Sequence, residues 1–317
     1  MNTSSETSSP TKQDSSTFLQ RLEWKEIDQE YLQDVALRSR QEDLEGFGLS
    51  SPPNRSGDRT SEALELTGQG AALLVARQPM VLCGQGLIPY LLEHFGGQAK
   101  HETHQTDGSW VESGTVLGKI WGNRITLLAA ERSLLNFIQR LSGIASTAKT
   151  FVDALSSAGK TALLDTRKTT PGHRVLEKYA VATGGGWNHR FGLFDRIMIK
   201  DNHIAACGSP DGKALSEIIR NAKMNASDML VQVEVDRLEQ IQPVLEAKAD
   251  ALLLDNFTLQ DLAAALKEIG DKAITEASGG ITLESIPSYS DLGLDFLSTS
   301  AMVGQAAWRD IGLDWLN

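Results

Sequence analysis

The C-terminal half of the chain repeats one pattern, in which a short apolar run is followed by an amphipathic segment. Between residues 160 and 300, the apolar runs end on polar or charged residues, which are Asp165, Lys200, Glu234 with Asp236, Asp255 with Asn256, Glu276 with Ser278, and Ser298. The amphipathic segments predict helices at 213–223, 237–247 and 258–269. Buried strands that alternate with helices favour a parallel sheet.

Polar side chains at the C-terminal ends of parallel strands are typical of the active site of a (β/α) barrel. Only about six or seven strands fit between residues 160 and 300, whereas a complete barrel has eight. The pattern therefore predicts a barrel that is incomplete, or one that is closed by something other than its own strands.

The first half of the chain predicts a separate α/β domain. Helices are predicted at 22–37 and 87–95, two strands at 71–84, and a β-rich module with glycine turns at 97–130. A long helix is predicted at 131–155. Residues 1–18 are rich in Ser and Thr, which predicts a disordered tail. A transit peptide fits these residues less well, because Glu6 and Asp14 are acidic and the tail has no Arg.

Composition narrows the range of partners. The formal net charge of −11 argues against general binding to nucleic acid or acidic membranes, and no apolar run is long enough to span a bilayer. Cys83 and Cys207 lie far apart and outside any CxxC spacing, so neither a disulfide framework nor a thiolate zinc site is expected. These features predict a cytoplasmic protein.

Residues 165–203 are basic in this otherwise acidic chain. Their cations include Arg167, Lys168, His189, Arg190 and Lys200, which lie where predicted strands or glycine turns end and not along one helix face. A solvated helix face is the alternative interpretation. Arg grips carboxylate or phosphate with two parallel hydrogen bonds, and Lys and His add charge and donors. We therefore predict a pocket for a small polyanion.

Two further groups are expected at the same mouth of the barrel. Glu234 and Asp255 end adjacent strands, which suits Mg²⁺ held together with substrate phosphates, or stabilisation of a cationic sugar; structural ion pairs are the alternative. Ser278, Gly279 and Gly280 precede a helix predicted at Leu283 and offer backbone N–H groups to a phosphate. Together they predict one substrate with carboxylates and another with several phosphates, bound through Mg²⁺.

Several motifs, in this order along the chain, resemble the quinolinate phosphoribosyltransferase family (nicotinate-nucleotide pyrophosphorylase, decarboxylating). They are ERSLLNFIQRLSGIAS, DTRKTTPG, EKYAVATGGGWNHRFGLFDRIMIKDNH, VEVD, LLDNF and EASGGI, and GDRTSEAL at residues 57–64 resembles the family's N-terminal motif. The resemblance covers about residues 20–305.

The resemblance implies both a fold and an activity. The fold is an N-terminal α/β sandwich domain at 19–130, an open, incomplete (β/α) barrel of about six strands at 131–305, and a C-terminal tail at 306–317 that packs on the N-terminal domain. The activity is transfer of a phosphoribosyl group from phosphoribosyl pyrophosphate to quinolinate, with decarboxylation, to give nicotinate mononucleotide, pyrophosphate and CO₂ in NAD biosynthesis. A homodimer is also implied.

The resemblance further implies roles for individual residues. Quinolinate-binding positions fall on Arg167, Lys168, His189, Arg190 and Lys200, and Arg132 matches an arginine that reaches the neighbouring subunit's site. Catalytic positions fall on Lys168, Glu234 and Asp255, the last two also as ligands of Mg²⁺, and phosphate-binding positions fall on Ser278, Gly279, Gly280, Ser298 and Ser300.

One segment departs from the family's pattern. Where the family usually has a run like SVGALTHS, residues 298–305 are STSAMVGQ, so Ser300 replaces a glycine and Gly304 a histidine near the phosphate. Two alternatives therefore stay open. One is a paralogous phosphoribosyltransferase with another acceptor, such as nicotinate, or the family member associated with molybdenum transport. The other is a non-catalytic barrel that binds a dicarboxylate.

Overall fold

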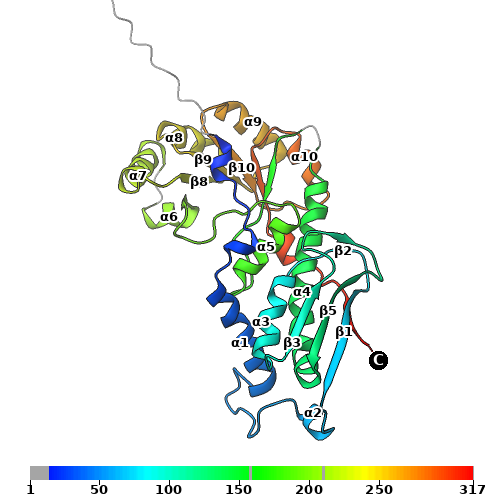
Figure 1. Cartoon of the computed structure of the whole chain (residues 1–317). Helices are drawn as coiled ribbons and strands as arrows, with labels where there is room; N and C mark the ends of the chain where they lie inside the picture. The colour runs from blue at the N-terminus through cyan, green and yellow to red at the C-terminus, as the bar shows by residue number, and fades with distance from the viewer. Residues whose placement is uncertain (1–13, 157–158, 209–210, 317) are drawn as a thin grey trace, which may run out of the picture. The chain divides into compact units, whose positions relative to one another are not determined.

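The computed structural model describes residues 14–156, 159–208 and 211–316, and the chain forms two compact units (Figure 1). The barrel unit consists of the described parts of Met1–Gln20, Asp153–Lys168 and Trp187–Ala301. The antiparallel unit consists of Arg21–Val152, Thr169–Gly186 and the described part of Met302–Asn317. These limits differ from the predicted boundaries near residues 130 and 305, because the chain returns to the antiparallel unit at Thr169.

The barrel unit is built on a parallel sheet of six strands, as predicted. The strand order is β6-β11-β10-β9-β8-β7. The strands are β6 (Ala162–Leu164), β7 (Ile197–Ile199), β8 (Val231–Val235), β9 (Ala251–Asp255), β10 (Ile274–Ser278) and β11 (Phe296–Ser298). The helices are α6 (Asp201–Ala206), α7 (Gly212–Asn225), α8 (Ile241–Glu246), α9 (Leu259–Ile269) and α10 (Ile286–Ser290).

Two short segments continue the hydrogen bonding beyond the β6 edge of this sheet. Trp187 pairs with Leu164, and Asn188 pairs in turn with Gln20. Strands β6 and β7 lie at the two edges of the sheet, so the predicted open, incomplete barrel of about six strands is confirmed. Residues near the N-terminus extend its β6 edge.

The predicted disordered tail at 1–18 is wrong for its last residues. Ser15–Phe18 form a 3₁₀ helix, η1, which Asp14 caps by accepting a hydrogen bond from the Ser16 backbone N–H. Phe18 is 1% exposed and packs in the barrel core with Phe296. Residues 1–13 lie outside the described residues. The prediction failed because burial of one aromatic side chain in a distant core outweighs a polar local composition.

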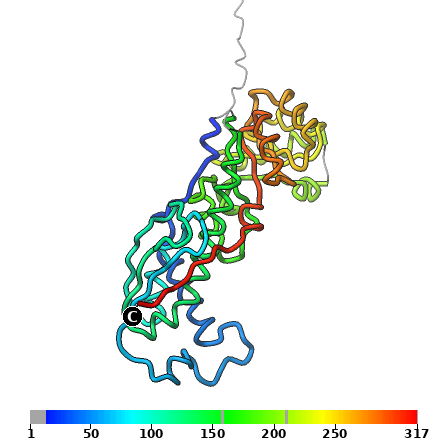
Figure 2. Tube along the Cα trace, turned by 90° about the vertical axis from the view of Figure 1, so that its right-hand side faces the viewer, coloured from blue at the N-terminus to red at the C-terminus, as the bar shows by residue number. Residues whose placement is uncertain are grey.

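The antiparallel unit contains a four-stranded sheet of order β12-β1-β5-β3. Its strands are β1 (Gln69–Ala76), β3 (Ala99–Thr103), β5 (Val116–Asn123) and β12 (Ile311–Trp315), and β2 (Met80–Val81) pairs separately with β4 (Trp110–Val111). Its helices are α1 (Gln29–Glu45), α2 (Arg59–Ala63), α3 (Ile88–His94), α4 (Arg124–Asp153), α5 (Arg174–Thr183) and α11 (Ala301–Gly304). Helix α4 ends one residue beyond the unit limit, and α11 starts one residue before it. Figure 2 shows the C-terminal segment running beside the early strands of this unit.

Helix α4 starts earlier than predicted. Residues 124–130 were expected in the β-rich module, but the Asn123 side-chain oxygen accepts hydrogen bonds from the backbone N–H groups of Ile125 and Thr126. These bonds satisfy two free donors at the helix start.

Among the described residues, no helix is long and apolar enough to cross a membrane.

Candidate active site

A cavity of about 310 Å³ opens at the C-terminal ends of the barrel strands. It is lined by Thr166, Arg167, Lys168, His189, Arg190, Met198, Lys200, Glu234, Leu253, Asp255, Glu276, Ser278 and Ser298. All five cations predicted from the sequence are among these residues, together with both predicted carboxylates and two of the predicted serines.

Strand register explains how these residues come together. Asp255, Ser278 and Ser298 are register partners on β9, β10 and β11. Glu234 on β8 pairs with Leu253, which lies two residues before Asp255 and therefore on the same face of the sheet. The polar ends of four adjacent strands thus line one face.

His189 is held by the residues around it. The buried carboxylate of Asp165, just after β6, accepts hydrogen bonds from the Asn188 amide (2.9 Å) and the His189 backbone N–H (2.7 Å). The Arg190 backbone N–H donates to His189 Nδ1 at 2.8 Å. With Nδ1 in this contact, Nε2 is the ring nitrogen that faces the rest of the cavity.

The sequence places Glu276 at the end of a predicted strand, but it was not assigned a role in the site. Its side chain is fully buried on β10, its Oε2 lies 3.4 Å from His189 Nε2, and it accepts a hydrogen bond of 2.7 Å from the Gln232 amide. Burial disfavours the charge, but the adjacent His189 and the hydrogen bonds from His189, Ser298 and Gln232 lower the pKa of Glu276 to about 2. Glu276 lies two residues before Ser278 on β10, so strand alternation puts both side chains on the same face of the sheet.

Arg190 and Arg167 repel each other at the cavity. Arg190 is 5% exposed, and burial together with the charge of Arg167 lowers the pKa of the Arg190 guanidinium. Its Nη1 donates to the Arg196 carbonyl at 3.3 Å. Arg167 Nε is buried and has no hydrogen-bond partner among the described residues. An anion between the two arginines would supply that partner and offset their repulsion.

Lys200 and Glu234 form an ion pair in the same cavity, with Lys200 Nζ 2.5 Å from Glu234 Oε2. Burial raises the pKa of Glu234 despite Lys200, and the charges of Asp255 and Asp201 act in the same direction as burial. Burial likewise raises the pKa of Asp255, against the effect of Lys200 and Lys168. Two carboxylates with raised pKa values on neighbouring strands would both be stabilised by an added cation.

Four predicted site residues do not line the cavity. Gly279 and Gly280 follow β10 with φ values of 91° and 61°, which favour glycine. A β-carbon on Gly279 would overlap the Asn256 side chain. Ser300 is half-buried just after β11, and Arg132 is exposed on α4 in the antiparallel unit.

The helix predicted at Leu283 is also wrong in position. Helix α10 begins only at Ile286 and has five residues, so no helix N-terminus directly follows Gly280. The residues between them form turns, in which the Ser285 hydroxyl accepts a hydrogen bond from the Thr282 backbone N–H.

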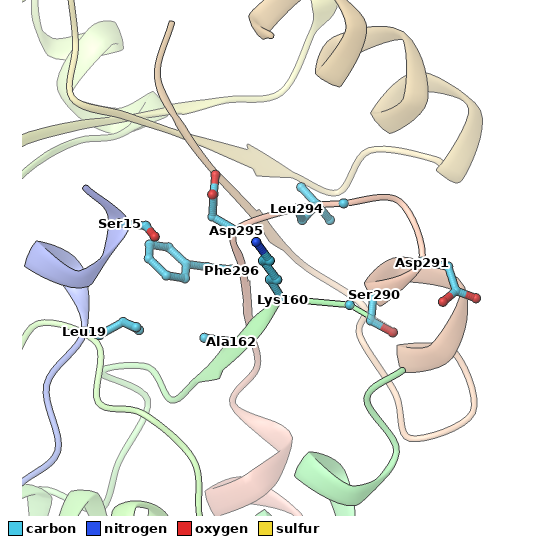
Figure 3. A pocket seen from close by; sticks show the side chains of 11 residues that line it. Ser15, Leu19, Lys160, Ala162, Ser290, Asp291, Leu294, Asp295 and Phe296 are labelled. Atoms are coloured by element: carbon cyan, nitrogen blue, oxygen red, sulfur yellow. The ribbon is translucent and has the colours of Figure 1, made fainter. Parts of the chain in front are cut away.

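A larger cavity, of about 410 Å³, lies at the opposite end of the barrel strands (Figure 3). Ala162 and Phe296, the first residues of β6 and β11, line it. Among the described residues that line it, Lys160 is the one cationic side chain, and Asp291 and Asp295 are also in its lining. This composition does not suit a dianion, whereas the lining of the smaller cavity does.

Glu234 and Asp255 are the carboxylates of the smaller cavity that could help to hold a metal ion. Among the residues that the structure describes, no group of three or more His, Cys, Asp or Glu side chains could hold a metal ion. Mg²⁺ is commonly held by one or two carboxylates together with substrate phosphates, and Glu234 and Asp255 offer that donor set.

Comparisons with known proteins agree with this arrangement. The model of the quinolinate phosphoribosyl transferase C-terminal domain matches residues 144–314, and that of the N-terminal domain matches residues 58–142. The chain is 38% identical over 260 residues to a probable nicotinate-nucleotide pyrophosphorylase [carboxylating] of Bacillus subtilis, covering 82% of this chain and 88% of the relative.

A plant relative and a solved structure are also similar. The chloroplastic nicotinate-nucleotide pyrophosphorylase [carboxylating] of Arabidopsis thaliana is 36% identical over 283 residues, covering 84% of this chain and 80% of the relative. The structure of the nicotinate-nucleotide pyrophosphorylase from Francisella tularensis has a TM-score of 0.82 at 34% identity, and the match covers 92% of this chain and 98% of that one.

Proposed function

This chain belongs to the quinolinate phosphoribosyltransferase family, and from that premise we propose that the smaller cavity is its active site. The enzyme transfers the phosphoribosyl group of phosphoribosyl pyrophosphate to quinolinate, with decarboxylation. The products are nicotinate mononucleotide, pyrophosphate and CO₂, in de novo NAD biosynthesis.

The observation that carries the proposal is the convergence of five cationic or hydrogen-bond-donating side chains on one cavity of about 310 Å³. Quinolinate has two carboxylates, and the buried Arg190 and the unpartnered Nε of Arg167 are suited to bind them. Nε2 of His189 faces Glu276, so the imidazole is fixed in one orientation beside the bound dianion. Binding at these groups would direct the ring nitrogen toward the anomeric carbon of the sugar.

Glu234 and Asp255 are proposed to stabilise the positive charge that develops on the ribose. As the bond to pyrophosphate breaks, the sugar gains oxocarbenium character, and two carboxylates at the cavity stabilise it electrostatically. Lys168, which is exposed at the cavity and whose charge acts on Asp255, adds positive charge for the anionic substrates. These roles are inferred from the charges of the side chains and their positions in the cavity. The ion pair with Lys200 keeps the Glu234 side chain in position.

Decarboxylation requires little further from the protein. Once the ring nitrogen carries the ribose it is positively charged, so the ring accepts the electron pair that CO₂ leaves behind. The cations of the cavity stabilise the transient carbanion, and a proton then takes the place of CO₂ on the ring carbon.

We also propose Mg²⁺, held by Glu234 and Asp255 together with the phosphates of phosphoribosyl pyrophosphate. The raised pKa values of both carboxyls support this assignment, because a bound cation would relieve the cost of burying their charges. When bound, the ion would neutralise charge on the departing pyrophosphate.

The test is incubation of the full chain with phosphoribosyl pyrophosphate and Mg²⁺ plus one of three acceptors: quinolinate, nicotinate or nicotinamide. Nicotinate mononucleotide and CO₂ are expected with quinolinate alone. Product from nicotinate would instead identify a paralogous transferase. Calorimetric binding of quinolinate without any product would identify a non-catalytic dicarboxylate-binding protein.

We further infer a homodimer in which Arg132 serves the neighbouring subunit's site. Its exposure on α4 and its absence from the lining of this chain's cavity support that role. Mixing inactive Arg132→Ala and Lys168→Ala subunits should restore part of the activity, through one hybrid site with both residues intact. Verified heterodimers that stay inactive would argue against the shared site.

A cytoplasmic location is proposed on the cysteines alone. Cys83 and Cys207 are both free, as expected in a reducing compartment. Fluorescence microscopy of the tagged chain is the direct check, and a signal confined to an organelle would contradict the proposal.

A further inference from the structure

Residues 15–20 pack against the part of the barrel that carries His189 and Arg190. The Asn188 backbone N–H donates to the Gln20 carbonyl at 2.8 Å, and Asn188 directly precedes these two site residues. Asn188 is itself fully buried and donates from its side chain to Asp165. The N-terminal segment therefore fixes the backbone from which two cavity side chains project.

Phe18 provides a second connection to the same site. Its ring lies under the Arg196 guanidinium, 4.3 Å from the ring centroid, and its carbonyl accepts a hydrogen bond of 3.1 Å from Arg196 Nη2. Arg196 Nη1 is buried and has no hydrogen-bond partner among the described residues. Phe18 thus supplies both the aromatic face and the acceptor that hold this arginine.

Arg196 in turn contacts Arg190. The Arg196 carbonyl accepts the hydrogen bond from Arg190 Nη1, at 3.3 Å, and Arg196 is 5% exposed. A buried guanidinium keeps its place only where hydrogen bonds and packing determine it, so a shift of Arg196 would move the carbonyl that orients Arg190.

The barrel core anchors the N-terminal end of this connection. Phe18 packs with Phe296, with ring centroids 6.2 Å apart, and with Leu164, Ala251 and Ile274. Figure 3 shows Ser15 and Leu19, on either side of Phe18 in sequence, beside Phe296. The segment is therefore part of the folded barrel and not an appendage.

We propose that Phe18 and Arg196 are positioning residues for the acceptor, through which the N-terminal segment holds Arg190 in the orientation that binds quinolinate. The inference rests on the proposed active site and deepens it. It predicts weaker binding of the dicarboxylate and unchanged binding of the phosphoribosyl donor. Neither Phe18 nor Arg196 lines the cavity, and the hydrogen bond that connects them to it is made to Arg190.

The test compares Phe18→Leu, Arg196→Lys and the double variant. Leucine keeps the apolar volume but removes the aromatic face, and lysine keeps the charge but removes the planar fork. A cation–π contact of about 0.5–2 kcal/mol corresponds to a rise of roughly twofold to thirtyfold in the KM for quinolinate. The KM for phosphoribosyl pyrophosphate should stay unchanged.

A matched control separates positioning from loss of stability. Phe95→Leu makes the same chemical change at a buried position of the antiparallel unit, where the side chain is 6% exposed. It should lower the melting temperature and leave the KM for quinolinate unchanged. If Phe18 and Arg196 act through one contact, the double variant should resemble the more affected single variant.

Three results would overturn the inference: an unchanged KM for quinolinate, an equal rise in the KM of both substrates, or a double-variant effect equal to the product of the single effects. The Kd for quinolinate, measured by calorimetry with the same variants, gives the comparison without turnover. A failure of the proposed catalysis would therefore be recognised separately from a failure of this inference.

Discussion

The substitution Glu276→Gln removes one buried charge from the site while keeping the shape of the side chain. In the wild type, Glu276 Oε2 faces His189 Nε2 and accepts a hydrogen bond from the Gln232 amide. A glutamine oxygen at the same place could accept from both groups. Its amide would then occupy the position of Oε1, which has no hydrogen-bond partner among the described residues. The substitution therefore isolates the contribution of the charge.

The size of that contribution follows from the pKa. The pKa of Glu276 is about 2, against an ordinary value of 4.5, because the adjacent His189 and the hydrogen bonds outweigh burial. At roughly 1.4 kcal/mol per pH unit, the ionised carboxylate contributes on the order of 3 kcal/mol of stability at neutral pH. For a unit of 150–250 residues, this corresponds to a fall of about 6–12 °C in the melting temperature.

The sign of the pH dependence is fixed by the lowered pKa. The folded state binds this proton more weakly than the unfolded state, so the stabilisation is fully present above pH 4.5 and is lost as the pH falls toward 2. The difference in melting temperature between wild type and Glu276→Gln should therefore be largest at neutral pH and narrow below pH 4.5.

The assay is thermal unfolding of both proteins at neutral pH and at several acidic values, followed by circular dichroism. Glu217→Gln, at an exposed position of α7, is the control and should behave as the wild type. An equal melting temperature for wild type and Glu276→Gln at neutral pH would refute the reasoning, as would a difference that stays constant through the acidic range.

Three further predictions concern the cavity and the strand ends beside it. Arg190→Ala should raise the KM for quinolinate about tenfold to hundredfold, through loss of a charge-assisted hydrogen bond, with an unchanged circular dichroism spectrum; near-normal kinetics would contradict the pocket assignment. Because burial raises the pKa values of Glu234 and Asp255, kcat/KM should start to fall at a higher pH than for ordinary carboxylates, and a pH–rate profile without this acidic limb would exclude their ionised forms from catalysis. Gly279→Ala should cost about 1–3 kcal/mol in urea unfolding, because its β-carbon would overlap a neighbouring side chain at positive φ, and should cost more than Gly280→Ala, which has open space; equal losses would argue against the overlap.

Much of the barrel could be predicted from the sequence, because each of its strands is recognisable from a few consecutive residues. Each buried strand is a short apolar run, and parallel pairing brings the last residues of all the runs to one edge. For that reason Lys200, Glu234 and Asp255, which are far apart in the sequence, line one cavity. The family motifs added the activity, which strand patterns alone do not specify.

The features that failed depend on contacts between distant residues. Phe18 stands in a polar segment, and only the core formed by Phe296 and its neighbours makes its burial favourable. Glu276 was not assigned a role because its environment comes from distant parts of the chain, Gln232 on β8 and His189 in the segment between α5 and β7. The boundaries of the two units differ for the same reason, since residues 169–186 join a unit that begins much earlier in the chain.

The pairing of β1 with β12 has a consequence for biosynthesis. β1 lies between β5 and β12 in the sheet. During synthesis, β5 is available to pair with β1 early, but β12 becomes available only after almost the whole chain has left the ribosome. During that interval, the nascent protein presents an unpaired strand edge that invites association with other chains. Expression vectors that shorten the chain before Ile311 would make this exposure permanent, and aggregation of such products is the expected outcome.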